Sequence, residues 1–202
     1  MINIAVFASG RGSNFSAIAQ AVKSRRLKVK LALLVCDNPQ APVLRKAKKY
    51  KIKIALVQRE DFARRGDFEK EIIRFLKEDS IDLIVMAGFM RMLSPYFVRV
   101  YKNRIINIHP SLLPSFKGAQ AIKDVFDYGV KVTGVTVHFV DEKMDHGAII
   151  LQKGIEVREA DTLSSLEAKI HKIEHLLYPA AIKLIALGKV KLRGRKAIIT
   201  GC

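Results

Sequence analysis

The chain has 202 residues, half of them hydrophobic, and only two cysteines, Cys36 and Cys202. This length allows a substantial core without disulfide or metal support, and the cysteine spacing fits neither a disulfide framework nor a metal site. The net charge of +17 is compatible with a nucleic acid or with small polyanionic substrates. Because the basic residues alternate with apolar ones, solvated helix and strand faces are favoured over a nucleic-acid surface.

The N-terminal segment has no basic stretch before an apolar core, and no apolar run approaches the roughly 20 residues of a membrane span. These features exclude a secretory signal peptide and a membrane helix by their pattern. We therefore expect a soluble, cytoplasmic protein.

The first half alternates short apolar runs with segments of helical periodicity, a pattern typical of parallel α/β folds. The expected strands are residues 2–8, 31–36, 52–57, 81–87 and 104–108, and the expected helices are residues 14–22, 42–50, 68–76 and 95–101.

The expected pattern of helices and strands changes after Gly118. We expect a helix at 119–128, strands at 133–140 and 148–157, a long helix at 163–187 capped by Asp161-Thr162, and a hairpin at 189–200 that turns at Arg193-Gly194. The long helix should bury Leu166, Ile170, Ile173, Leu177 and Ile185. Together these elements predict a single-domain, Rossmann-like α/β fold with helices on both faces of a mostly parallel sheet that becomes mixed in its C-terminal part.

The first strand runs into the turn Ser9-Gly10-Arg11-Gly12-Ser13-Asn14 and then a helix. Glycines in such a turn let the backbone approach an anion at the helix N-terminus. The third glycine of a dinucleotide-binding motif is replaced by Phe15, so a phosphate monoester bound by Gly12, Ser13 and Asn14 fits better. The alternative is a glycine turn in which Ser13 or Asn14 only caps the helix.

The ends of the fourth and fifth expected strands also carry candidate functional residues. Arg91, with Met90, Met92 and Leu93, follows the fourth strand at the edge where α/β sheets bind ligands; the apolar neighbours suit a flat heterocycle or, alternatively, ordinary core packing.

Asn107 and His109 close the fifth strand, on the same side by strand alternation. An amide beside an imidazole at this edge favours catalysis over a structural histidine. The acidic segment 141–147 is able to bring a carboxylate to His109, although spacing alone does not identify which one.

Five motifs, SGRGSN, GFMRMLSP, NIHPSLLPSF, GVTVHFVDEKMDHGAIILQ and IEHLLYP, occur in an order and spacing that resemble the folate-dependent formyltransferase family. They span residues 2 to about 180. NIHPSLLP and the acidic segment are shared across that family, while the first turn is similar more narrowly to the phosphoribosylglycinamide formyltransferases.

The resemblance implies transfer of a formyl group from 10-formyltetrahydrofolate to the amine of 5'-phosphoribosylglycinamide in de novo purine biosynthesis, yielding formylglycinamide ribonucleotide and tetrahydrofolate. It implies a catalytic trio of Asn107, His109 and Asp145, in which Asn107 and a protonated His109 donate to the oxyanion and Asp145 holds a proton-relaying water. Carried over by position, the substrate contacts are Gly12, Ser13, Asn14 and Glu174, and the folate contacts are Arg65, Met90, Arg91, Met92, Leu93, Asn107, Val140 and Asp141.

The resemblance also implies one formyltransferase domain over residues 1–202, with a nucleotide-phosphate half at 1–108 and a folate-binding and catalytic half at 109–202. Its partners are small molecules, without a metal, nucleic acid or membrane, and the chain is a monomer or a homodimer. Lys117 and Gln120 depart from the proline and histidine common in relatives, which bears on loop rigidity and folate affinity.

Several alternatives stay open. His171 and His175 lie one helical turn apart, but the sequence offers no third metal ligand. His138 is most simply a core or sheet-face histidine, and His146 flanks the acidic segment as a turn residue. A hydrolase of formylfolate and a formylase of methionyl-tRNA are expected to need an additional domain, and a nucleic-acid-binding module would not depend on the catalytic trio.

Overall fold

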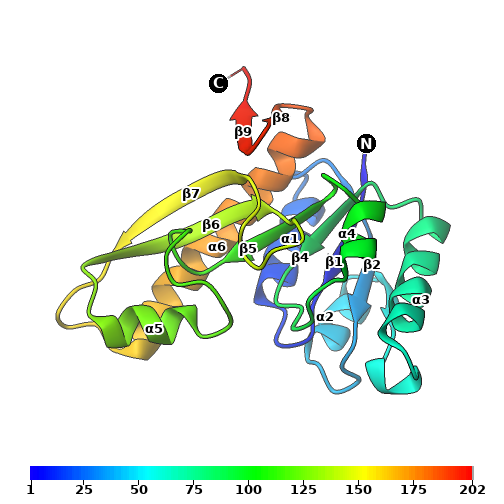
Figure 1. Cartoon of the computed structure of the whole chain (residues 1–202), viewed down its shortest axis with the longest axis horizontal. Helices are drawn as coiled ribbons and strands as arrows, with labels where there is room; N and C mark the ends of the chain where they lie inside the picture. Colours follow the sequence, from blue (N-terminus) through cyan, green and yellow to red (C-terminus); the bar gives the residue numbers. More distant parts are fainter. Residues whose placement is uncertain (202) are drawn as a thin grey trace. The chain divides into compact units, whose positions relative to one another are not determined.

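The computed structural model of the chain describes residues 1–201 and has two units, Met1–Ile106 and Asn107 onward. Cys202, for which no role is expected, lies outside the described residues. The first unit contains β1 (Asn3–Phe7), α1 (Ser13–Lys23), β2 (Lys30–Cys36), α2 (Val43–Lys49), β3 (Lys53–Leu56), the short 3-10 helix η1 (Arg59–Asp61), α3 (Arg65–Glu78), β4 (Leu83–Met86) and α4 (Pro95–Val100) (Figure 1). The strand β5 (Ile105–His109) begins in this unit and ends in the next.

The second unit contains α5 (Ala121–Tyr128), β6 (Val132–Phe139), β7 (Ile149–Glu156), α6 (Leu163–Ala186), β8 (Val190–Arg193) and β9 (Lys196–Ile199). The sheet order is β3-β2-β1-β4-β5-β6-β7, with β8 and β9 as a separate hairpin. β1 is parallel to β2 and β4, β2 is parallel to β3, and β6 is antiparallel to β7. The predicted α/β fold, with a mostly parallel sheet that is mixed at its C-terminal strands, is confirmed.

The strands and helices of the first unit bury their apolar residues in one core. Ile4 to Phe7 of β1 and all of β4 are buried, as expected for parallel strands covered on both faces. Helix α3 buries Phe68, Ile72 and Leu76 on one face. The carboxyl ends of β1 and β4 therefore hold their connecting loops on a rigid base.

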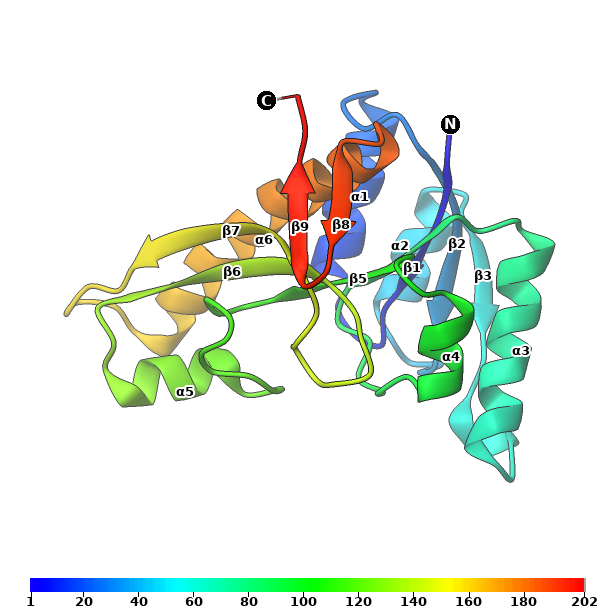
Figure 2. The same cartoon turned by 45° about the horizontal axis from the view of Figure 1, so that its top comes forward.

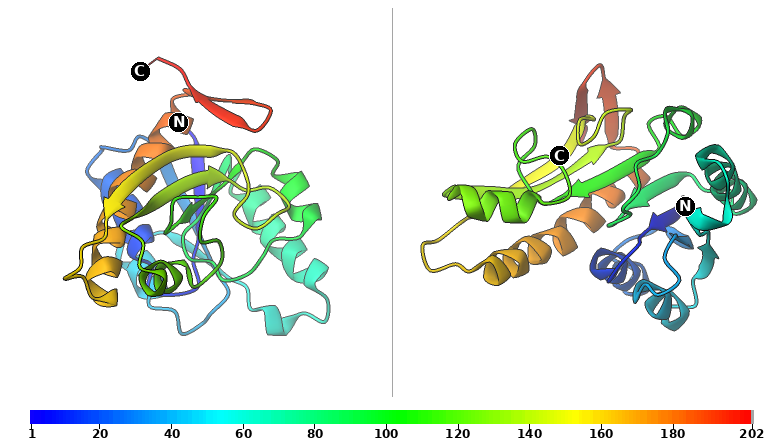
Figure 3. Two further views of the ribbon diagram at one scale, coloured as in Figure 1. Left: turned by 60° about the vertical axis from the view of Figure 1, so that its left-hand side comes forward. Right: turned by 60° about the horizontal axis from the view of Figure 1, so that its bottom comes forward.

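Helix α6 packs along β6 and β7 and against α5 in the second unit (Figure 3). Leu166 and Ile170 are buried as predicted, whereas Ile173, Leu177 and Ile185, which were also expected to face inward, are only half-buried. The buried face consists of Leu166, Ile170, Glu174, Tyr178, Ala181 and Ile182. The apolar pattern missed this face because the polar residue Glu174 lies in its middle.

The ends of α6 and of the hairpin follow from local chemistry. Thr162 accepts a hydrogen bond from the N–H of Ser165, whose hydroxyl in turn accepts from the N–H of Thr162, a capping box that confirms the predicted helix start. The hairpin turns at Gly194-Arg195, one residue beyond the expected position, with Gly194 at φ +57°.

Each other expected helix and strand is present, with ends that differ by a few residues. Among residues 1–201, no helix is both long and apolar enough to cross a membrane.

The capping box makes a stability prediction. Thr162→Ala removes the acceptor for the N–H of Ser165, so we expect the free energy of unfolding to fall by about 1 kcal/mol, which corresponds to a melting temperature lower by roughly 2–4 °C. Urea denaturation followed by circular dichroism measures this change. Ser164→Ala, at an exposed position in the same helical turn, is the control and should not destabilise the chain. An equal loss in both variants would argue against the cap.

Candidate functional site

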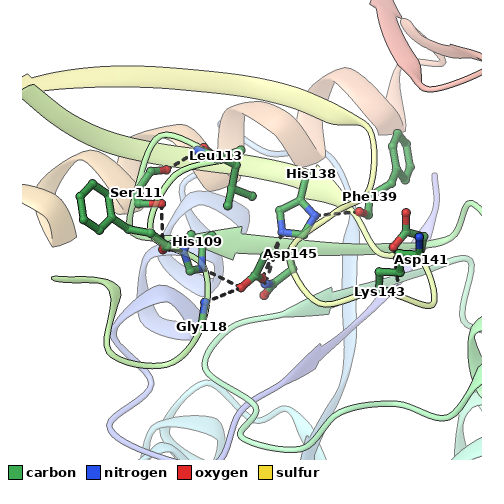
Figure 4. Close-up of polar contacts among 12 residues, drawn as sticks. His109, Ser111, Leu113, Gly118, His138, Phe139, Asp141, Lys143 and Asp145 are labelled. Atoms are coloured by element: carbon green, nitrogen blue, oxygen red, sulfur yellow. Dashed lines mark hydrogen bonds and ion pairs between the residues drawn. The ribbon is translucent and has the colours of Figure 1, made fainter. Parts of the chain in front are cut away.

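Three side chains of the second unit converge on the carboxylate of Asp145 (Figure 4). Its Oδ2 atom lies 3.4 Å from Nδ1 of His109 and accepts a 3.0 Å hydrogen bond from the N–H of Gly118. Its Oδ1 atom accepts a 3.5 Å bond from the amide nitrogen of Asn107 and lies 3.8 Å from Nε2 of His138. Only 10% of the Asp145 side chain is exposed. The site thus holds an amide, two imidazoles and a desolvated carboxylate within contact distance.

Strand β5 orients two of these groups. Asn107 and His109 are two residues apart and both reach Asp145, as the predicted strand alternation requires. The other ring nitrogen of His109, Nε2, donates to the carbonyl oxygen of Phe116 over 2.7 Å. That carbonyl also accepts from Ser111 Oγ, so the segment after β5 fixes the imidazole from its far side.

The acidic loop, which we define as residues 140–147, brings Asp145 to this site. Asp145 has a φ of +45°, a left-handed conformation that is uncommon for a residue with a side chain. Gly147 closes the base of the loop, where a Cβ atom would lie 1.8 Å from the carbonyl oxygen of Phe139. Only glycine permits this approach, so a local backbone constraint sets the direction of Asp145.

His138 is the residue that the sequence reasoning missed. It is 2% exposed on β6, and its Nε2 lies 3.5 Å from the amide nitrogen of Asn107. The β6–β7 register shifts between Val137 and His138, an irregularity of the kind that re-aims side chains near sites. Burial lowers the pKa of His138, against the opposing effects of its bond with the Phe139 carbonyl and of Asp145. The sequence signal for His138 was a titratable residue within a mostly apolar strand that also contains Thr133 and Thr136.

The phosphate candidates lie in the first unit. Gly12 is the N-cap of α1 at φ +67°, and a Cβ there would meet Cγ2 of Val43 at 2.4 Å. The N-cap residue is Gly12, whereas Ser13 and Asn14 are the first two residues of the helix itself. The first N–H groups of a helix have no helical acceptors, which makes this end suitable for an anion.

The loop after β4 is tied to neighbouring elements of the first unit by ion pairs. Arg91 Nε lies 2.5 Å from Asp37 Oδ2, and a second guanidinium nitrogen lies 3.1 Å from Glu60. These bonds raise the pKa of Arg91, chiefly through Asp37.

Arg65 binds the buried carboxylate of Glu69 and the carbonyl oxygen of Met92, while Glu69 accepts from the N–H and hydroxyl of Ser94. Met90 and Met92 are 72% and 56% exposed, so the core alternative is wrong for both, and Leu93 is half-buried. An anchored backbone therefore presents exposed apolar side chains.

The remaining candidate residues, Asp141, Val140 and Glu174, lie outside the cluster around Asp145, and two of them contact histidines. Asp141 binds His146 over 2.7 Å, and the half-buried Val140 precedes it. Buried Glu174 accepts from His171, whose ring stacks on that of His175.

Residues 1–201 contain no group of three or more His, Cys, Asp or Glu side chains that is able to hold a metal ion. Lys117 and Gln120, the departures from the family pattern, are both exposed.

The chain is similar to known proteins in both sequence and structure. The profile of the family described as "Formyl transferase" matches residues 2–182. Phosphoribosylglycinamide formyltransferase of Bacillus subtilis (strain 168) is 46% identical over 198 residues, covering 98% of this chain and all of the relative. The solved structure of glycinamide ribonucleotide transformylase 1 from Symbiobacterium toebii has a TM-score of 0.97 at 36% identity and covers 100% of this chain and 95% of its own. The trifunctional purine biosynthetic protein adenosine-3 of Gallus gallus is 41% identical over 95% of this chain, which corresponds to 19% of that protein.

The lowered pKa of His138 predicts how the free energy of unfolding depends on pH. The pKa of this group in the unfolded chain is near 6.5, so below about that pH the unfolded state binds more protons than the folded state. The corresponding stability is present above pH of about 6.5 and is lost as the pH falls. We expect the free energy of unfolding to decrease from about pH 7 to about pH 5 more steeply in the wild type than in His138→Gln, by up to about 1.4 kcal/mol per pH unit.

Urea titrations at several pH values measure both slopes, with His171→Gln, which removes a half-exposed imidazole, as the control. Identical slopes for the wild type and His138→Gln would mean that burial does not suppress protonation of His138.

Proposed function

Because the chain belongs to the formyl transferase family, we propose that it transfers a formyl group from 10-formyltetrahydrofolate to the amine of 5'-phosphoribosylglycinamide, a step of de novo purine biosynthesis. The observation that carries this proposal is the contact of Asp145 with both His109 and Asn107 at the end of β5. The substrate assignment is supported by the Bacillus subtilis relative, which aligns over its full length.

In the proposed reaction, the free amine attacks the formyl carbon, and a tetrahedral oxyanion forms before the folate amine leaves. Asn107 and protonated His109 donate hydrogen bonds to that oxyanion. Asp145 lies beside the imidazole as an opposite charge and holds the water that carries the proton from nucleophile to leaving group.

The substrate phosphate is assigned to Gly12, Ser13 and Asn14, which we term the phosphate loop. The N-terminal end of α1 supports this assignment, since its first N–H groups are suited to an anion. Lys46 adds positive charge nearby, with Nζ 3.3 Å from the Gly12 carbonyl oxygen. Glu174, buried on α6, is the proposed partner of the substrate in the second unit.

The folate contacts are proposed to be Arg65, Met90, Arg91, Met92, Leu93, Asn107, Val140 and Asp141. The exposed side chains of Met90 and Met92 on an ion-paired loop support an apolar contact with a flat ring. Arg65 donates to Met92, which supports a role in holding that loop in addition to any contact of its own.

The remaining assignments are a nucleotide-phosphate half at residues 1–108, a folate-binding and catalytic half at residues 109–202 to which Asn107 adds one catalytic side chain, and action in the cytoplasm as a monomer or homodimer. The proposed partners are the two small substrates, without nucleic acid. No metal takes part in the proposed steps.

The first test is formyl transfer with three acceptors in parallel: glycinamide ribonucleotide, initiator methionyl-tRNA and buffer alone. We expect transfer only to the ribonucleotide, and we expect His109→Ala to lower turnover about 100- to 1,000-fold, because it removes an oxyanion donor. His175→Gln, which removes an imidazole outside the trio, should retain most of the activity. Formyl loss in buffer would indicate a hydrolase, and transfer to tRNA would indicate a different acceptor; a near-normal rate in His109→Ala would refute the mechanism.

The phosphate loop has a matched pair of glycine variants. Gly12→Ala forces a Cβ against Val43 at a left-handed backbone position, whereas a Cβ at Gly10 would have no atom within 4 Å. We expect Gly12→Ala to weaken ribonucleotide binding roughly tenfold or more, the equivalent of losing one hydrogen bond to a charged group, and Gly10→Ala to change it far less. Isothermal titration calorimetry with the ribonucleotide measures both. Equal affinities in the two variants would remove the support for a phosphate site at Gly12.

A further inference from the structure

Strands β8 and β9 form the C-terminal hairpin (Figure 2). Arg195, in the turn between them, contacts the acidic loop through its side chain. Its Nη1 atom lies 2.7 Å from Nε2 and 3.1 Å from Nδ1 of His146. A guanidinium is always a donor, so the ring nitrogen that it meets must be the acceptor. The contact joins segments that are 49 residues apart in the sequence.

His146 relays this contact to the start of the acidic loop. Its Nδ1 atom donates to Oδ2 of Asp141 over 2.7 Å, while Oδ1 of Asp141 accepts from the N–H of Lys143. Burial alone would raise the pKa of Asp141, but the bonds from His146 and Lys143 and the charge of Arg195 outweigh it, and the pKa is lowered. Asp141 is therefore held as the acceptor in a chain that begins at Arg195.

The chain from Arg195 to His146 to Asp141 spans the acidic loop and leaves Asp145 directly beside His146. Asp145 has a left-handed backbone, a strained conformation that persists only when its surroundings impose it. Gly147 fixes the base of the loop against Phe139. The chain of polar contacts supplies the constraint at the other side of the loop.

The space beside the contact between Arg195 and His146 is partly open. A recess of about 460 Å³ lies beside the contact, lined by Gly147, Ile149, Arg195, Lys196, Ala197 and Ile198. β9 packs against β7, which fixes the hairpin itself.

We propose that Arg195 is a positioning residue for formyl transfer: through His146 and Asp141 it fixes the acidic loop so that Asp145 meets His109 and Asn107. The inference rests on the proposed function for its catalytic consequence, whereas the restraint of the loop is a property of the second unit alone. Arg195 acts through other residues and is not assigned any contact with substrate.

The experiment compares Arg195→Ala, Arg195→Lys and, as a matched control, Arg193→Ala, which removes an exposed arginine of the same hairpin. We expect Arg195→Ala to lower kcat about 10- to 100-fold, the scale for a displaced catalytic group, with the KM for the ribonucleotide within about twofold of wild type. Arg195→Lys keeps a donor for His146 and should restore part of kcat. Hydrogen exchange followed by mass spectrometry should show faster exchange of residues 141–146 in Arg195→Ala only.

Each outcome decides the proposal. An unchanged kcat in Arg195→Ala, or the same loss in Arg193→Ala, would overturn it, as would a lower melting temperature with no change in kcat or loop exchange. If the wild type transfers no formyl group, the proposed function fails by itself. In that case the exchange data still test the restraint: faster exchange of the loop in Arg195→Ala supports it, and unchanged exchange refutes it.

Discussion

The carboxylate of Asp145 is the group on which the second unit depends. Removing a carboxylate from water is costly unless donors and opposite charges replace the solvent. Here the N–H of Gly118, the amide of Asn107 and the imidazole of His109 take that place. The same contacts hold together the end of β5, the segment that follows it and the acidic loop. The local fold and the proposed chemistry therefore rest on one set of hydrogen bonds.

Backbone conformation makes this convergence possible. Asp145 and Phe116 both have positive φ, and their polar groups meet opposite sides of the His109 imidazole. Such conformations persist where surrounding contacts impose them, and they cluster at functional sites. Gly147 permits the close approach of two backbone segments at the base of the acidic loop, and Arg195 is proposed to restrain the loop from the hairpin.

In the first unit, apolar side chains are exposed on a loop whose backbone is held in place. Met90 and Met92 project from a short loop whose backbone and neighbouring side chains are tied down by Arg91 to Asp37 and by Arg65 through Glu69. Exposed apolar groups on a fixed backbone lose little conformational freedom on binding, which suits a ligand contact.

The sequence by itself determined the order of the helices and strands, the start of α6 at Thr162 and the pairing of Asn107 with His109 on one side of β5, because these features depend on local periodicity and capping chemistry. It also carried the family resemblance. Only the tertiary structure decided that His138 joins Asp145, that Glu174 lies in the middle of the buried face of α6, and that Arg195 reaches His146. These contacts join residues that are far apart in the sequence or reverse the usual exposure of a charged group. No local pattern encodes them, since their energies come from burial and from partners that only the folded chain supplies.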